Sequence, residues 1–537
     1  MKKQPVIAVL DIGKTNKKLF VMDENYHIIL EKTEQFTDIL DDDGEPCEDI
    51  NRLSDWIDTS LKTVINDANF DVKAVNFSTY GASFVLLKTQ PIGASGRVEG
   101  KVIAPLYNYL KAFPDDLKTA FYSKYGGEET VSSQTASPVL GNLNSGMQLY
   151  FLQKRKPHIY NVATAALHLP QYASFLVTKR LFSDITSIGC HTNLWHFEQN
   201  DYHDWVEQEG ISKILPPIFP SDAAIPALFE GKELVVGVGL HDSSAALIPY
   251  LMSFQEPFIL ISTGTWCISM NPFNDVPLTP QELAQDSLCY LSYQGKPVKA
   301  ARIFAGNEHE IETRRIAEHF NCPSNFYKTI DFNPEIISQL GITNYELGKA
   351  GNELGITNYE LGKAGNELGI RNYELGKAGD ELGIRNYELG KVGDELGIRN
   401  YELGITQDAL AEAHDVLEND VPNLTLKVSS FANRDLSDFE NVTVAYHQLM
   451  LDLVKLQTFS THLIIQNTPV RRLFVDGGFS KNPIYMNLLA ESFPELEVFA
   501  ASVAQATAVG AALAIHRFWN QKPLRRDLIE LKYYAVN

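Results

Sequence analysis

The stretch VIAVLDIGKTNKKLFVMD, residues 6–23, decides how the fold of this chain is interpreted. Its letters GKT end a phosphate-binding P-loop, but the glycine that such a loop needs five positions before the GK is replaced by Ala8. A P-loop also opens into a helix, whereas apolar and β-favouring residues follow here. The stretch therefore predicts a strand, a tight turn at residues 13–16 and a second strand, with Asp11 at the end of the first strand.

The same pattern of apolar strand, small polar turn and apolar strand returns at residues 257–270, PFILISTGTWCISM. Between and after the two copies, strand-like and helix-like segments alternate, as at residues 53–70 and 471–493. Residues 232–252 predict a strand that ends at a polar turn and opens into a helix. This alternation predicts an α/β fold in which the hairpin occurs once in each half.

Composition excludes several classes of protein. A chain of 537 residues is too long for one core, and 44% hydrophobic and 21% charged residues are typical of a soluble globular protein. A net charge of −21 argues against a nucleic-acid partner, and no apolar run reaches membrane-spanning length. The five cysteines are odd in number and widely spaced, which favours neither disulfides nor a zinc site. We therefore expect a cytoplasmic protein that binds neither nucleic acid nor membrane.

One segment differs from the rest of the chain. Residues 340–404 repeat the unit LGITNYELGKAGNE with a period of fourteen. Each unit carries three glycines, which cost a helix interior about 1 kcal/mol each, and its leucines make only a thin apolar stripe. The unit is also shorter than those of solenoid proteins. We expect a surface insertion, with an interaction arm as the alternative.

Five strings occur in the order typical of one family. They are LDIGKTNKKLFVMD (10–23), GLHDSSAAL (239–247), STGTWCISM (262–270), VDGGFSKNPIYMNLLAES (475–492) and QATAVGAALAI (505–515). Together they resemble the FGGY carbohydrate kinases of the sugar kinase and actin superfamily. STYGASFVLLK, residues 78–88, and HDSSAAL are most similar to rhamnulokinase-like members.

The resemblance implies two RNase H-like (actin-like ATPase) domains with a cleft between them. The first would span residues 1–245, on the sugar and phosphate side, and the second residues 246–537, on the nucleotide side, with the repeat as an insertion. It also implies transfer of the γ-phosphate of ATP, with Mg²⁺, to a hydroxyl of a ketose. The acceptor that the resemblance favours is a 6-deoxy ketose such as L-rhamnulose or L-fuculose. A xylulose or polyol kinase, or a non-catalytic relative whose repeat serves protein binding, are the alternatives. A homodimer is compatible with the resemblance.

Two aspartates are the expected centre of the chemistry. Asp242 lies where a strand ends and a helix begins, which is where α/β sheets place ligands. The resemblance makes it the base that accepts the sugar hydroxyl proton, whereas a helix N-cap is the structural alternative. Asp11 would hold Mg²⁺ through water, with Asp242 as the second carboxylate at the metal, although Asp11 alone is equally typical of a turn.

The remaining candidate residues follow from the matched strings. Phosphate and ATP contacts are expected from two hairpin turns and a glycine pair: Gly13, Lys14, Thr15, Asn16, Thr263, Gly264, Thr265, Gly477, Gly478 and Asn482. Which of Lys14, Lys17 and Lys18 contacts phosphate stays open. Sugar contacts are expected from Thr79, Tyr80, Gly81, His191, Asn193 and Asp242. Ser83, Tyr109 and Lys111 depart from the residues common in the family, so the identity of the sugar stays open.

Overall fold

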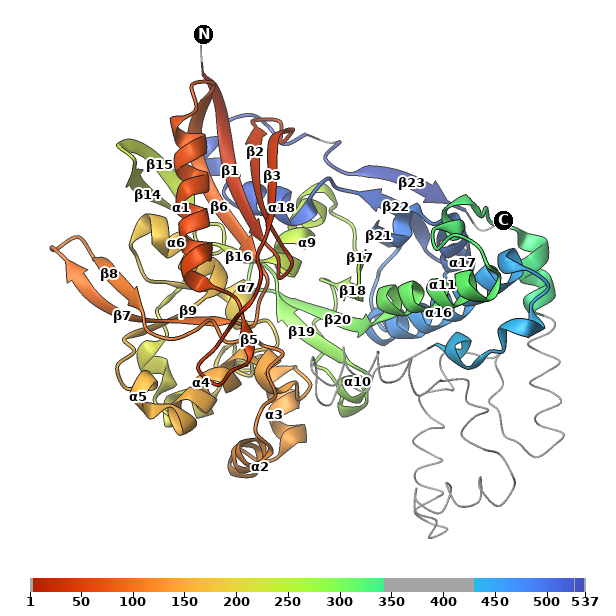
Figure 1. Ribbon diagram of the computed structural model, residues 1–537, viewed down its shortest axis with the longest axis horizontal. Helices are drawn as coiled ribbons and strands as arrows, with labels where there is room; N and C mark the ends of the chain where they lie inside the picture. Colours follow the sequence, from red (N-terminus) through yellow and green to blue (C-terminus); the bar gives the residue numbers. More distant parts are fainter. Residues whose placement is uncertain (1–2, 342–428, 526, 536–537) are drawn as a thin grey trace.

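Two seven-stranded sheets organise the part of the chain that the computed structural model describes, residues 3–341, 429–525 and 527–535 (Figure 1). The predicted repeat lies outside these residues from position 342 onward. The first sheet has, in spatial order, β14 (Ala224–Phe229), β15 (Lys232–Gly237), β6 (Phe70–Thr79), β1 (Gln4–Ile12), β2 (Asn16–Asp23) and β3 (Ile28–Gln35), and β16 (Leu240–His241) also pairs with β6.

The second sheet contains the other copy of the hairpin. Its strands are, in order, β19 (Ser287–Leu291), β20 (Pro297–Ile303), β18 (Cys267–Asn271), β17 (Phe258–Thr263), β21 (Arg472–Gly477), β22 (Glu497–Ser502) and β23 (Glu530–Tyr534). In both sheets the hairpin strands pair antiparallel, β1 with β2 and β17 with β18, and the first hairpin strand is parallel to a following strand. Both predicted hairpins are confirmed.

Strand β1 is apolar on both faces because both faces are covered. Its even-numbered residues Val6, Ala8 and Leu10 pack in a core shared with α1 (Ile50–Asn66). Ile7 and Val9 point to the opposite face and pack in a second core with residues of α9 and α18. A buried strand of this kind reads as a continuous apolar run, as residues 6–10 do.

The end of the chain returns to the first sheet. Helix α18 (Ala506–Ala514) packs against α9 (Asp242–Ser253) and against β1 and β6. Gly510 makes this approach possible, because a Cβ there would lie 1.8 Å from the carbonyl oxygen of Ala245. The side chain of Asn76 on β6 also donates to the carbonyl of Ala511 at 2.7 Å. The first sheet is therefore covered by residues from both halves, and a division at residue 245 stays a prediction.

Helices cover the second sheet on the side away from the first. The helices α11 (Ala305–His319), α16 (Val442–Ile465) and α17 (Pro483–Ser492) share a core with alternate residues of β17 and β21 (Figure 1). Asn441 and Asn482 cap α16 and α17 by accepting hydrogen bonds from the first backbone N–H groups. Among the described residues, no helix combines the length and apolarity that a membrane span requires.

A further group of elements is inserted between β6 and β14. It is built on a three-stranded sheet of β8 (Arg97–Val102), β7 (Phe84–Ile92) and β9 (Ala165–His168). Its helices are α2 (Asp115–Lys124), α3 (Glu128–Thr135), α4 (Ser145–Arg155), α5 (Pro157–Tyr160), α6 (Leu169–Thr178), α7 (Ile185–Ile188) and α8 (Asp204–Gln208). Short strand pairs complete the fold: β4 (Ile39–Leu40) with β5 (Pro46–Cys47), β10 (Ser183–Asp184) with β13 (Ile218–Phe219), and β11 (Trp195–His196) with β12 (Asp201–Tyr202). Helices α10 (Pro280–Ala284) and α19 (His516–Trp519) flank β19 and α18.

Candidate active site

Three parallel strands of the first sheet end together. Asp11 on β1 is level with Ser78 on β6, and His241 on β16 is level with Thr79. Asp242 follows His241 directly and is the first residue of α9. The carboxyl ends of parallel strands are where α/β sheets bind ligands, so Asp11 and Asp242 converge on one candidate site.

Asp11 is a half-buried carboxylate held by the returning end of the chain. The Thr507 hydroxyl of α18 donates to its Oδ2 at 2.9 Å. Burial, together with the nearby negative charge of Asp242, raises the pKa of Asp11 to about 6. The negative charges of Asp11 and Asp242 repel each other. A cation at this site would therefore be stabilised by both carboxylates.

Asp242 is partly open to solvent, with 34% of its side chain exposed. Its Oδ1 accepts from the Ser243 backbone N–H at 2.6 Å and lies 3.2 Å from Nε2 of His241. Burial lowers the pKa of His241, so the ring is neutral. His241, not Asp242, occupies the N-cap position of α9, and its side chain makes no capping hydrogen bond. The carboxylate is therefore not used as the helix cap.

The first hairpin turn is held from inside the protein by Lys17. Its ammonium group donates to the carbonyls of Gly13 and Lys14, at 3.1 and 2.8 Å, and lies 2.7 Å from the buried carboxylate of Glu48. Lys17 is thus engaged in an ion pair beneath the turn. Its role is to fix the loop conformation of residues 13–16.

The other candidates of this turn have different surroundings. Lys14 lies 3.4 Å from Asp38, and Lys18 donates to the Gln505 amide at 3.3 Å. Thr15 is exposed, and the Asn16 side chain accepts from Gln35 at 2.9 Å. Thr15 and the backbone of the turn are therefore the groups most accessible to a ligand.

The second hairpin turn is tied to the glycine pair of the second sheet. The buried Thr263 hydroxyl donates to the Asp476 carbonyl at 2.6 Å and accepts from the Phe479 N–H at 3.0 Å. Gly477 has φ +96°, and a Cβ there would lie 1.9 Å from the Thr263 carbonyl oxygen, so only glycine fits. The Thr263 hydroxyl is thus occupied, whereas Gly264 and Thr265 are exposed.

A pocket of about 550 Å³ lies beside this turn. It is lined by Thr263, Gly264, Gly306, His309, Tyr327, Lys328, Ile330, Asp331, Gly478, Phe479, Lys481, Asn482 and Pro483. The predicted Asn482 lies in its wall, but its amide oxygen caps α17 and its Nδ2 donates to the Tyr446 hydroxyl at 2.7 Å. The pocket has the size of a small-molecule site with glycines at its edge.

The residues predicted to contact a sugar separate into two groups. Thr79 and Gly81 lie beside His241: a Cβ at Gly81 would be 2.6 Å from the His241 ring, which explains the glycine. The Thr79 hydroxyl donates to the Tyr80 carbonyl at 2.8 Å, and the Tyr80 hydroxyl donates to Glu48 at 2.7 Å. These contacts shape the loop that faces Asp242.

His191 and Asn193 are more deeply engaged in the protein. Nδ1 of His191 lies 3.2 Å from the Leu143 carbonyl oxygen, and burial lowers the pKa of the ring to about 3. The Asn193 amide is buried, donates to the Tyr122 hydroxyl at 3.1 Å and accepts from Thr135 at 3.2 Å. The structure therefore brings Asp11, Thr79, Gly81 and Asp242 together but places Asn193 within a core.

Residues 255–330 match the family model described as carbohydrate kinase FGGY, C-terminal domain. This segment is thus similar to the C-terminal domain of the FGGY carbohydrate kinases. A rhamnulokinase from Halalkalibacterium halodurans is 24% identical over 272 residues, which is 48% of this chain and 54% of that protein. The chain thus spans about half the length of the curated relatives it matches.

Solved structures show the same fold across nearly the whole chain. A carbohydrate kinase from Novosphingobium aromaticivorans superimposes with a TM-score of 0.65 at 19% identity, covering 100% of this chain and 95% of that one. A ligand-bound xylulose kinase from Lactobacillus acidophilus superimposes with a TM-score of 0.67 at 13% identity, covering 99% and 94%. The predicted fold class, α/β with two actin-like ATPase domains, is confirmed.

Several residues of this candidate site were not predicted from the sequence. Thr507, His241 and Cys190 each contact the two aspartates or their neighbours: Cys190 Sγ lies 3.8 Å from His241 Nε2. For His241, the sequence offered one indication, its position directly before Asp242. Thr507 lies in the matched string QATAVGAALAI, but that string does not indicate a contact with Asp11, which joins opposite ends of the chain.

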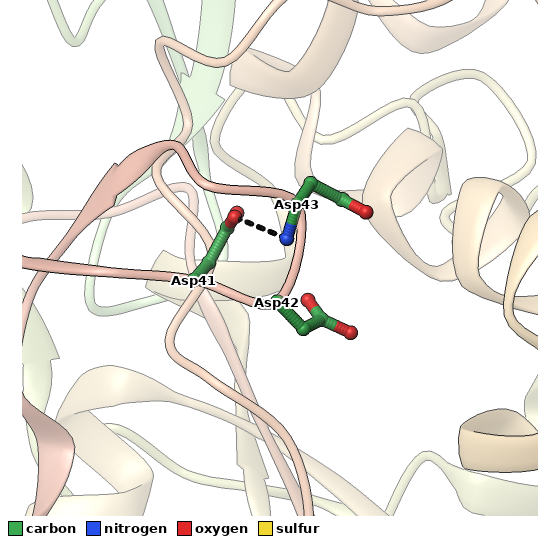
Figure 2. A group of neighbouring side chains, drawn as sticks. All are labelled: Asp41, Asp42 and Asp43. Atoms are coloured by element: carbon green, nitrogen blue, oxygen red, sulfur yellow. Dashed lines mark hydrogen bonds between the residues drawn. The ribbon is translucent and has the colours of Figure 1, made fainter.

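An acidic turn outside the cleft has the spacing of a metal site but is already neutralised. Among the described residues, Asp41, Asp42 and Asp43 form a group whose ligand atoms lie within 4.8 Å of one another (Figure 2). Lys111 Nζ lies 2.6 Å from both Asp41 and Asp43, and Lys156 lies 2.6 Å from Asp42. We assign no metal to this turn, and the charge of Lys111 is used by Asp41 and Asp43.

Proposed function

We propose that this chain is an ATP-dependent sugar kinase that transfers the γ-phosphate of ATP to a hydroxyl group of a ketose. The observation that carries the proposal is the position of Asp242 at the start of α9, next to the half-buried Asp11 carboxylate. The likeness to rhamnulokinases favours a 6-deoxy ketose such as L-rhamnulose or L-fuculose over xylulose or a polyol. A cytoplasmic location and a homodimer belong to the same proposal.

The geometry fits a division of labour between the two halves. Asp242 accepts the proton of the attacking hydroxyl, and the neutral His241 ring and the Ser243 N–H orient its carboxylate. The turns at residues 13–16 and 263–265 supply backbone N–H groups to the phosphates from opposite sides of the cleft. The 550 Å³ pocket receives the nucleoside.

Asp11 and Asp242 are the residues that would hold Mg²⁺. The raised pKa of Asp11, caused by burial and by the charge of Asp242, fits a carboxylate that is stabilised by a cation. When bound, the ion neutralises charge that develops on the phosphoryl oxygens. The chain's contribution is to keep the Asp11 carboxylate fixed through the Thr507 hydroxyl.

The proposal is tested by ADP formation from ATP and Mg²⁺ with a panel of acceptors. The panel contains L-rhamnulose, L-fuculose, D-xylulose, glycerol and gluconate. We expect ADP formation that depends on one of the ketoses and that requires Mg²⁺. ADP formation that no acceptor accelerates would contradict a kinase and favour a non-catalytic or ATP-hydrolysing relative.

Asp11→Asn is expected to raise the Mg²⁺ concentration needed for half-maximal turnover by about tenfold or more. The amide keeps the shape of the side chain but removes the charge that attracts the ion. The KM for the sugar should stay within about threefold. Asp58→Asn, at an exposed ion pair with Lys62, is the control and should leave the Mg²⁺ dependence unchanged. Equal loss of sugar and Mg²⁺ affinity in Asp11→Asn would indicate a structural turn residue instead.

Gly306→Ala is expected to raise the KM for ATP by about tenfold. A Cβ at Gly306 would lie 1.8 Å from the Gly264 carbonyl oxygen and 2.9 Å from that of Thr265, so the second phosphate turn must shift. The sugar KM should change by less than about threefold, because the base Asp242 and the predicted sugar contacts Thr79 and Gly81 belong to the first half of the chain. Steady-state kinetics with each substrate varied would measure both, and an unchanged ATP KM would place the phosphates away from this turn.

A further inference from the structure

Arg302 and Asp286 form a bidentate ion pair at the edge of the second sheet. Nη2 of Arg302 donates to Oδ1 of Asp286 at 2.7 Å, and Nε donates to Oδ2 at 3.2 Å. The side chains are 10% and 14% exposed, so the pair is mostly buried but not closed off. Such a fork holds both side chains in one fixed orientation.

The pair lies next to the second phosphate turn. Arg302 on β20 is level with Ile268 on β18, and its guanidinium lies 5.4 Å from the ring centre of Trp266. Trp266 directly follows the exposed residues Gly264 and Thr265. Arg302 is therefore beside the place where the transferred phosphoryl group is expected.

The pair also faces the first half of the chain. Side chains alternate along a strand, so Arg302 shares a face of β20 with Ala300, which packs in a core with Cys190 and Ala245. Ala245 is three residues after Asp242. Figure 1 shows β19 and β20 in the middle of the molecule, between the first sheet and helices α11 and α16.

Electrostatics agree with this placement. Burial, together with the positive charge of Arg302, lowers the pKa of His191 to about 3. The same charge acts on the neighbouring Cys190, whose thiol lies 3.8 Å from the His241 ring. The charge of Arg302, a residue of the second half, therefore reaches groups of the first half that lie near the base Asp242.

We propose that Asp286 and Arg302 recognise two neighbouring hydroxyl groups of the acceptor sugar. The inference rests on the proposed kinase function and assigns a specificity-determining pair to it. A carboxylate and a guanidinium side by side offer an acceptor and donors to a vicinal diol, whose hydroxyls both donate and accept. Among the described residues, Nη1 of Arg302 has no hydrogen-bond partner, so a donor remains for the ligand.

This pair selects for a polyhydroxylated acceptor. A site built to pair particular hydroxyls rejects analogues that lack them, because its own polar groups are then left unpaired. Lys111, the cation of the loop at residues 107–111, cannot take this part while it is bound to Asp41 and Asp43. The specificity of the first half is thus completed by residues of the second.

The first test is Arg302→Met, which keeps an unbranched stem but removes the guanidinium. We expect the KM for the sugar to rise by about tenfold or more and the KM for ATP to stay within threefold. Arg302→Lys keeps the positive charge but loses the forked guanidinium. Its KM for the sugar should therefore lie between those of Arg302→Met and wild type. Arg434→Met is the matched control, since it breaks the bidentate Arg434–Asp452 pair, at 2.6 and 3.2 Å, elsewhere in the second half. It should lower the melting temperature without changing the sugar KM.

The second test uses deoxy analogues of the best acceptor. The analogue that lowers kcat/KM most for wild type should lower it by less than about threefold for Arg302→Met, because the partner of that hydroxyl is already gone. The inference is overturned if Arg302→Met, like Arg434→Met, lowers only the melting temperature. It is also overturned if every analogue lowers kcat/KM by the same factor for Arg302→Met and for wild type. Selection of an acceptor carboxylate by Arg302 would overturn it as well. Absence of transfer by wild type to any acceptor overturns the proposed function together with the inference.

Discussion

We expect Asp242→Asn to lower kcat by about 10²-fold or more and to leave the KM for ATP nearly unchanged. The amide retains the size of the side chain and can keep the hydrogen bond from the Ser243 N–H, but it cannot accept the hydroxyl proton. A loss confined to turnover is the signature of an interaction made in the transition state. Steady-state kinetics at saturating sugar would measure it.

The control for this substitution is Asp222→Asn. It makes the same chemical change at a carboxylate that pairs with Arg517 and not with His241 or Ser243, and it should change kcat by less than twofold. Near-normal turnover of Asp242→Asn would contradict the assignment of Asp242 as the base. A loss of ATP affinity of the same size would instead indicate that Asp242 serves mainly to bind the nucleotide.

We expect Gly510→Ala to destabilise the protein by about 3 kcal/mol. Helices α9 and α18 touch through their backbones at this point, so the added methyl group, 1.8 Å from the Ala245 carbonyl oxygen, can be accommodated only if one helix moves. The melting temperature should fall by about 5–10 °C. Because Asp242 begins α9, kcat should fall as well.

Gly478→Ala is the control for stability, because a Cβ there meets nothing within 4 Å. Its melting temperature should stay within about 1–2 °C of wild type. Urea unfolding of both variants would measure the difference. A Gly510→Ala protein as stable as wild type would show that the two helices can separate without loss.

The local elements were predictable because each has a signal of its own. The two hairpins follow from apolar strands around small polar turns, and the strand at residues 232–237 leads to the helix that begins at Asp242 as expected. The long apolar helix at residues 442–465 is present as well. Asp11 and Asp242 meet because both follow buried parallel strands, which the sequence pattern contains.

The roles of individual polar side chains were less predictable. Lys17 is next to a candidate phosphate turn in sequence, yet its charge is used beneath the turn by Glu48, thirty-one residues away. Asn482 caps α17, and Asn193 is satisfied by Tyr122 and Thr135. Partners of this kind are set by tertiary packing, and one sequence carries no local signal for them.

The return of α18 to the first sheet has a consequence for the synthesis of this protein. The strands β1 and β6 leave the ribosome early, but the helix that completes their cover begins at Ala506, near the end of the chain. At translation rates of about 5–20 residues per second, the apolar face of Ile7 and Val9 waits on the order of a minute for its final partner. The chain would thus need a chaperone while its first half is made and α18 is not. A transcript truncated before α18 would yield a protein with the face of Ile7 and Val9 exposed.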